Sequence, residues 1–310
     1  MGFAPIRISV LRGDQKIGFD CYIEVAGKQL LYLRKGDSFE GARLAKLKEK
    51  KVKKMLIREE DEQLYRDYMA RNIDMAYDKN SSQSLENRAN IVQGLQQSNT
   101  EAVFENPADE VAYAAAKEGS QRFTDFLMAE DKAIKNLLAL ENADQSLSHH
   151  GVTVASLAVR IAKETGYDSP KNLPLLAMGG LIHDLGHYIS GQNITRPIKD
   201  FSPQELELYK QHPAEGAKKF KDLKHMDQHV VQIILEHEEN INGSGFPDKK
   251  VEAKLNPLSV YVGSANLFDR LVTFERVPRA DVVKRLFSSE YLGRYPLSHF
   301  NAIKTILQGN

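Results

Sequence analysis

The stretch Leu181-Ile182-His183-Asp184-Leu185-Gly186-His187 places a His-Asp pair at the end of an apolar, helix-like run that begins near Leu173. Adjacent His and Asp side chains inside an apolar segment are costly unless another group pairs with them, and a bound metal ion is a common partner. Eight of the nine histidines of the chain lie between His149 and His237. The sequence therefore indicates a metal site in this part of the chain.

The composition is that of a globular chain without a strong charge bias. The chain has 310 residues, no formal net charge and a single cysteine, Cys21. This length allows one large or two moderate domains, and the balanced charge does not favour a nucleic acid polymer as partner. One cysteine excludes an intrachain disulfide and a thiolate cluster, so a metal would bind His, Asp, Glu or Asn, which suits iron, manganese or zinc. No apolar run is long enough to cross a bilayer and no signal peptide is visible, so we expect no membrane insertion and a cytoplasmic location.

The spacing of apolar residues predicts three parts. Residues 1–78 combine short strand-like segments with two helical ones, which predicts a small α/β accessory domain. Residues 79–122 are polar and then Ala-rich, which predicts a helical or loose connector, and residues 123–310 are almost wholly helical in pattern. The expected helices of the third part are 147–165, 173–184, 203–211, 213–220, 225–239 and 257–274, with two more between 278 and 307. The predicted fold class is mostly α: an all-helical domain preceded by a small α/β domain and a helical connector.

Helical periodicity selects among the histidines. His150 shares a helix face with apolar residues and is expected to point inward, whereas His149 shares its face with polar residues and is expected to point outward. His237 lies on the apolar stripe of a later helix, and Glu238 lies at the edge of that stripe. A single inward histidine is most often just hydrogen-bonded to backbone, but several on separate helices, with an Asp and a Glu beside them, favour a metal site.

Two further histidines are expected at helix ends. His212 precedes Pro213, which disfavours helical conformation at position 212, so His212 should lie at a junction between two helices. His183 and His187 have the i, i+4 spacing of two-histidine zinc sites, but Gly186 is expected to end their helix. We therefore expect His187 to lie on the substrate side of a site or at the surface rather than to bind metal.

The order of these residues resembles the HD-GYP branch of the HD phosphohydrolase superfamily. His150, His183-Asp184 and His212 are followed at 237–247 by His-Glu-Glu-Asn-Ile-Asn-Gly-Ser-Gly-Phe-Pro, where that family carries His-His-Glu-x-x-Asp-Gly-x-Gly-Tyr-Pro. The match spans about residues 147–271. The resemblance implies an all-helical domain that holds two or three metals, usually iron or manganese, and hydrolyses the second messenger cyclic di-GMP.

The resemblance also implies a role for each matching residue. The implied metal positions are His150, His183, Asp184, His212 and His237, with Asp184 as the bridge between metals, and Glu238 and Asn266 at two further ligand positions. Asp269, three residues after Asn266, is the alternative to it. Asp184 and His187 are the candidate catalytic residues. A Glu that some members place before the first His is Ser146 here, so two divalent ions are expected, iron ahead of manganese.

Departures from the family pattern leave the reaction open. Glu238 replaces a His, Asn242 an Asp, Phe246 the Tyr of Gly-Tyr-Pro, and His187 a Lys. The first interpretation is a phosphodiesterase that cleaves cyclic di-GMP. The second is a degenerate member that binds metal, with or without nucleotide, as a sensor or as a docking module for signalling proteins. The third is an HD phosphohydrolase with another phosphoester substrate.

Overall fold

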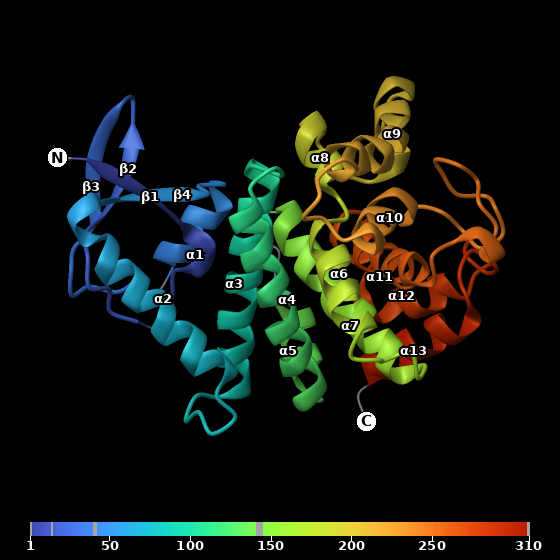
Figure 1. Cartoon of the computed structure of the whole chain (residues 1–310), viewed down its shortest axis with the longest axis horizontal. Coiled ribbons are helices and arrows are strands. Elements are labelled where there is room, and N and C mark those ends of the chain that lie inside the picture. Colours follow the sequence, from blue (N-terminus) through green and yellow to red (C-terminus); the bar gives the residue numbers. More distant parts are fainter. Residues whose placement is uncertain (1, 14, 40–41, 141–144, 309–310) are drawn as a thin grey trace.

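The computed structural model describes residues 2–13, 15–39, 42–140 and 145–308. A small sheet with two helices forms one end of the molecule, and helices form the rest (Figure 1). The prediction of a mostly α chain with a small N-terminal α/β part is confirmed. None of the helices in these described ranges is both long and apolar enough to span a membrane.

The N-terminal part is built on a four-stranded antiparallel sheet with the strand order β1-β4-β2-β3. Its elements are β1 (Phe3–Arg7), the 3-10 turn η1 (Ile8–Val10), β2 (Cys21–Val25), β3 (Lys28–Leu33), α1 (Arg43–Glu49), β4 (Lys54–Arg58), η2 (Glu59–Asp61) and α2 (Glu62–Tyr77). Ala26 and Gly27 both have positive φ, as a two-residue hairpin turn between β2 and β3 requires. Phe19, Ile57 and Tyr68 belong to a separate apolar core of this part.

The segment predicted as a helical or loose connector is helical in the structure. It contains α3 (Leu85–Glu105) and α4 (Glu110–Ala129), followed by α5 (Ala133–Ala139). The side chain of Ser84 caps α3, and a Cβ atom at Gly94 would collide with the carbonyl oxygen of Ser9 because α3 packs directly on η1. Arg7 pairs with Glu105 at 2.7 Å, which ties β1 to the end of α3. The connector therefore joins the two ends of the molecule through packed contacts.

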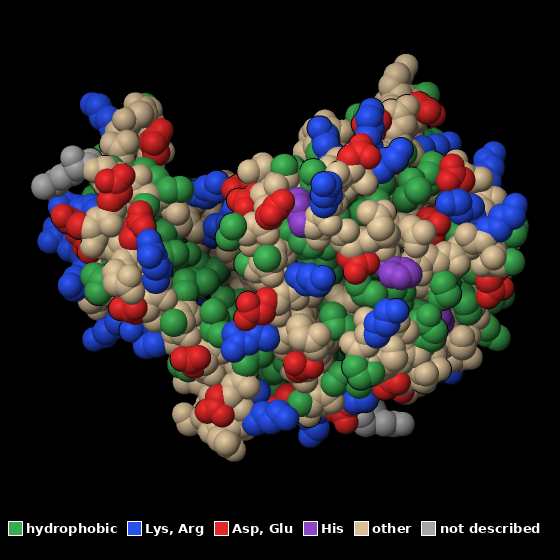
Figure 2. Space-filling view, viewed as in Figure 1, with side chains coloured by type: hydrophobic (Ala, Val, Ile, Leu, Met, Phe, Trp, Pro, Cys, Tyr) green, Lys and Arg blue, Asp and Glu red, His purple; other side chains and the backbone are tan. Residues whose placement is uncertain are grey.

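The regular elements of the C-terminal part are helices and short 3-10 turns. They are α6 (Leu147–Glu164), α7 (Asn172–Ile182), α8 (Leu185–Ser190), η3 (Ile198–Asp200), α9 (Pro203–Phe220), α10 (Gln228–Glu236), η4 (Glu252–Lys254), α11 (Pro257–Thr273), α12 (Arg279–Leu286) and α13 (Leu297–Gln308). Figure 2 shows the surface hollowed between the sheet end and the α8–α9 end. Tyr188 of α8 packs on Phe104 of α3 at 5.3 Å between ring centroids, and Lys53 lies 5.8 Å from the Tyr188 ring.

Two predicted helix boundaries are wrong. The helices expected at 203–211 and 213–220 form one continuous helix, α9, with Pro213 inside it. Gly186 does not end a helix either, because α7 ends at Ile182 and α8 begins at Leu185. The break therefore falls at His183 and Asp184, which leaves both side chains at a turn between two helices.

Candidate metal centre

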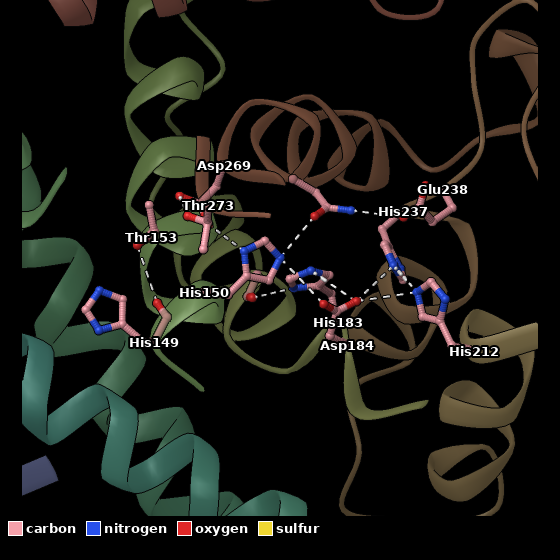
Figure 3. A network of polar contacts seen from close by, with 12 residues as sticks. His149, His150, Thr153, His183, Asp184, His212, His237, Glu238, Asp269 and Thr273 are labelled. Atoms are coloured by element: carbon pink, nitrogen blue, oxygen red, sulfur yellow. Dashed lines mark hydrogen bonds and ion pairs between the residues drawn. The ribbon is translucent and has the colours of Figure 1, made fainter. Parts of the chain in front are cut away.

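Two histidines within helices, His150 and His212, and two at helix ends, His183 and His237, direct their Nε2 atoms at the buried carboxylate of Asp184 (Figure 3). The distances to the nearer Asp184 oxygen are 3.5 Å for His150, 3.4 Å for His183, 3.4 Å for His212 and 3.6 Å for His237. Oδ2 of Asp184 faces His150, and Oδ1 faces the other three. The five side chains predicted as the main metal ligands thus come together at one point, in sets whose donor atoms lie within 4.8 Å of one another.

Backbone carbonyl groups hold three of these rings in place. Nδ1 of His183 donates to Gly180 O at 2.8 Å, Nδ1 of His212 to Tyr209 O at 2.6 Å, and Nδ1 of His237 to Ile234 O at 2.9 Å. A proton on Nδ1 leaves the lone pair on Nε2, the atom that faces Asp184 in each case. The rings are therefore oriented as a metal site requires.

Local sequence explains why those carbonyl groups are available. His183 and His237 follow the last residues of α7 and α10, where backbone carbonyls lose their helical partners. In the middle of α9, Pro213 has no N–H to donate to Tyr209 O four residues earlier, so that oxygen accepts from His212 instead. The predicted junction at His212 is wrong, but Pro213 still serves the site by freeing this acceptor.

His150 is held by a carboxylate rather than by backbone. Its Nδ1 lies 2.6 Å from Asp269 Oδ2, and its Nε2 lies 3.1 Å from Asn266 Oδ1. Thr273 donates a hydrogen bond to Asp269 at 3.2 Å. The sequence left Asn266 and Asp269 as alternative ligands. Asn266 lies at Nε2 of His150, the ring nitrogen that faces the cluster, whereas Asp269 contacts Nδ1 on the other side of that ring.

Glu238 lies beside His212 and His237, within reach of the same centre. Its Oε1 accepts hydrogen bonds from Tyr209 Oη at 2.6 Å and from Asn266 Nδ2 at 3.2 Å. The carboxylate is therefore fixed by two neighbours at the edge of the cluster.

His187 lies inside the molecule, so its alternative placement at the surface is wrong. It is 1% exposed, its ring centroid lies 3.7 Å from that of His212, and Asp184, His187 and His212 form one possible ligand set. The cause is the close packing of α8 on α9, where a Cβ atom at Gly186 would collide with the carbonyl group of His212. The substrate-side role predicted for His187 stays a prediction.

His149 is buried, contrary to the outward position predicted for it. It is 7% exposed because α3 and the N-terminal part cover the polar face of α6. Its ring nevertheless points away from the cluster that His150 joins (Figure 3). The prediction that His150 points into the cluster and His149 away from it is therefore confirmed, but the prediction that His149 is exposed is wrong.

The electrostatics of the cluster fit a divalent ion. Burial lowers the pKa of His183 to about 3, so this ring is neutral. Burial alone would raise the pKa of Asp184, but the neighbouring rings of His183, His212 and His237 hold that pKa well below its usual range. Nε2 of His183 is buried and makes no hydrogen bond to any described residue, although Asp184 lies near it. Imidazole nitrogens around an ionised carboxylate are a donor set for iron, manganese or zinc.

A cavity of about 460 Å³ opens beside the cluster. Tyr209, Glu238, Phe246, Asn266 and Arg270 all contribute to its wall. Sequence reasoning missed two of them, Tyr209 and Arg270. A signal was present, because Tyr209 precedes His212 by about one helical turn and Arg270 follows Asn266 by four residues, which puts each pair on one helix face.

One domain family and several known proteins are similar to this chain. The HD domain family matches residues 132–285. The solved structure of Bd1817, a HDG"Y"P protein from Bdellovibrio bacteriovorus, is 45% identical, with a TM-score of 0.94 over 99% of this chain and 100% of that one. The cyclic di-GMP phosphodiesterase PA4108 of Pseudomonas aeruginosa is 23% identical over 174 residues, which cover 55% of this chain and 41% of that protein. A cyclic di-GMP phosphodiesterase of Thermotoga maritima is 30% identical over 162 residues, which cover 51% of this chain and 42% of that protein.

The two phosphodiesterases match over less than half of their own length. The similarity to Bd1817 extends over the whole chain and includes the N-terminal part. The HD domain match contains every residue that converges on Asp184. The chain therefore belongs to the HD-GYP family.

Proposed function

We propose that this chain is a metal-dependent phosphodiesterase that hydrolyses cyclic di-GMP at a dinuclear centre. The observation that supports it best is the convergence of four histidine Nε2 atoms on the carboxylate of Asp184. Two divalent ions in such a site would supply the Lewis-acid chemistry that phosphodiester hydrolysis needs. Iron is the preferred metal and manganese the alternative, since the donors are nitrogen and carboxylate oxygen.

Each residue has a proposed task. Asp184 would bridge the two ions, because its two oxygens face different histidines. Asn266 and Glu238 would complete the shell from the side of the cavity, and His187 would act on the substrate side. Residues 123–310 would form the phosphodiesterase domain, with 79–122 as connector and 1–78 as accessory domain.

A second candidate is a catalytically weak member that binds metal, with or without nucleotide, as a sensor or docking module for signalling proteins. Two observations favour it. Phe246 lines the cavity without the hydroxyl of the family tyrosine. Asn266 and Glu238 are hydrogen-bonded to each other at 3.2 Å, and an amide is a weaker ligand than the Asp that the family motif places at position 266.

A turnover assay separates the two candidates. Protein loaded anaerobically with Fe(II), or with Mn(II), is incubated with cyclic di-GMP, and linear pGpG and GMP are separated by chromatography. The proposal requires product with wild type and none with Asp184→Asn, which keeps the side-chain shape but removes the charge. Cyclic di-GMP binding without product would favour the second candidate. Metal-loaded protein that neither binds nor cleaves cyclic di-GMP would reject the phosphodiesterase proposal and leave only the metal-binding form of the second candidate.

A further inference from the structure

Arg270 is a buried cation in the wall of the cavity beside the metal centre. It is 7% exposed, and its guanidinium carbon lies 4.7 Å from the ring centroid of Tyr209 and 5.8 Å from that of Phe274. Two aromatic rings thus fix the plane of the guanidinium group. A charge held so firmly away from water needs a partner to offset the loss of hydration.

The protein does not fully supply that partner. Nε and Nη2 of Arg270 are buried and donate no hydrogen bond to any residue in the described ranges. The nearest carboxylate is that of Glu275, whose Oε1 is 3.9 Å from Nη2, too far for a hydrogen bond. The same oxygen accepts the backbone N–H of Ile198 at 2.9 Å. Two adjacent donors of a planar fork are therefore buried without an acceptor among the described residues, and a small movement of the side chain into the cavity would present them to a ligand.

The position of Arg270 relates those donors to the candidate metal centre. Arg270 follows Asn266 by four residues on α11, so the two side chains share a face about 6 Å apart along the helix. Asn266 contacts His150 in the cluster, and Tyr209, which stacks on Arg270, donates to Glu238 at 2.6 Å. The guanidinium group is thus fixed one helical turn from the centre, in the wall of the same cavity.

We propose that Arg270 binds the substrate phosphate, with Nε–H and Nη2–H donating to two oxygens of one phosphate group. This inference rests on the proposed function, since it assumes a phosphodiester in the cavity. Arginine suits the task because its fork matches two phosphate oxygens and stays charged at every working pH. Position 187, where the family motif has Lys, carries His187, whereas Arg270 on α11 places a fixed positive charge in the wall of the cavity beside the centre.

The other cations of the cavity are less suited to this task. Arg285 has a half-exposed side chain that pairs with Glu290 at 3.2 Å, Arg294 is partly exposed with its guanidinium carbon 4.9 Å from the centroid of the Tyr291 ring, and Lys199 is exposed to solvent. Exposed charges are well hydrated and contribute less to the affinity for an anion than a buried, oriented one. Lys199 is therefore a matched control: it is a cation in the wall of the same cavity but is exposed to water.

The test measures ligand binding to protein loaded with Mn(II), by calorimetry, with cyclic di-GMP and with inorganic phosphate as separate probes. The variants are Arg270→Gln, Arg270→Lys and the control Lys199→Gln, each checked for metal content. Loss of a charged hydrogen-bonding pair predicts about 10- to 100-fold weaker binding of both probes by Arg270→Gln. We expect about 10-fold for Arg270→Lys, which keeps the charge and loses the fork, and less than about 3-fold for Lys199→Gln.

Wild-type affinity for both probes in Arg270→Gln, with normal metal content, would overturn the inference. If Arg270→Gln does not fold, Arg270→Lys becomes the test. Unchanged affinity of Arg270→Lys for both probes would exclude the two-donor contact and overturn the inference. Wild type that binds neither probe also overturns it. Wild type that binds phosphate through Arg270 but not cyclic di-GMP keeps the inference and rejects the proposed substrate. Cyclic di-GMP affinity that is unchanged in the Arg270 variants rejects the inference and keeps the proposed substrate.

Discussion

The carboxylate of Asp269 lies 2.6 Å from Nδ1 of His150, while Nε2 of the same ring faces the carboxylate of Asp184. A carboxylate behind a metal-binding histidine fixes the ring and makes it a stronger ligand. Asp269 follows the last converging His by more than thirty residues, yet α11 brings it against α6. It is thus a positioning residue for the candidate centre.

Asp269→Asn is expected to weaken metal binding by about 10- to 100-fold without unfolding the protein, because the amide keeps the shape but loses the charge that supports His150. Competition with a fluorescent chelator measures the affinity. Thr273→Val is the matched control, since Thr273 only donates to Asp269 at 3.2 Å. Equal metal affinities of wild type and Asp269→Asn would show that Asp269 does not support His150 as a metal ligand.

Asp184→Ala is expected to lose both metal ions, because all four converging Nε2 atoms face this one carboxylate. Elemental analysis of the purified protein after metal loading gives the number of ions per chain. Asp125→Ala, which removes an exposed carboxylate from α4, should keep the wild-type content. Two ions per chain in Asp184→Ala would show that Asp184 is not the bridge.

The sequence predicts the cluster better than the helices that carry it. His150 and His237 could be selected because apolar periodicity reports the buried face of a helix. His212 could not be placed, because a rule on the residue before proline concerns backbone preference, and tertiary packing kept α9 continuous across Pro213. Periodicity predicts an outward-facing His149, because it cannot show that another helix, α3, covers the polar face of α6.

Arg270 illustrates a further limit of sequence reasoning. Its position four residues after Asn266 was visible, but its burial depends on Tyr209 from α9, which no local pattern connects to α11. Contacts between helices distant in sequence decide which charged residues are buried. For this reason the candidate metal ligands, which form a recognisable order along the chain, could be predicted, and the proposed phosphate-binding residue could not.

His149→Ala and His150→Ala should differ in metal content. His149→Ala is expected to keep two ions per chain, because its ring points away from the cluster, whereas His150→Ala should lose metal. Both side chains are buried, so each truncation should also lower the melting temperature by several degrees. Elemental analysis measures the loss of metal, and thermal melts measure the loss of stability, so the two effects can be separated. Metal loss in His149→Ala alone would show that the helix faces are assigned wrongly.

Acid should lower the stability of the protein, in part because His299 takes up a proton more readily in the unfolded chain than in the folded one. Burial lowers its pKa from 6.5 to about 4, and its Nδ1 lies 2.8 Å from Ser264 Oγ. Between these pH values the unfolded chain binds the proton and the folded chain does not, so stability is full above pH 6.5 and is lost as the pH falls toward 4. The expected contribution is about 3 kcal/mol.

Urea unfolding of wild type and His299→Gln, both in chelator to remove metal, tests this contribution. The variant cannot take up the proton, so its free energy of unfolding should fall less steeply between pH 6.5 and 4. Other buried histidines contribute equally to both curves and cancel in the difference. Parallel curves over this range would show that His299 does not titrate with the predicted shift.

Glu238 should act on metal binding as a ligand in place of the family's second His. Glu238→Ala is expected to lower metal occupancy, since it removes a carboxylate held beside His212 and His237. Glu238→His should keep two ions and bind cyclic di-GMP at least as tightly, because it removes a negative charge that opposes an anionic phosphodiester. Tyr209→Phe is the control for occupancy: it deletes the 2.6 Å hydrogen bond to Glu238 but keeps the carboxylate. Unchanged occupancy in both Glu238 variants, with unchanged affinity, would assign Glu238 to the cavity wall and not to the metal.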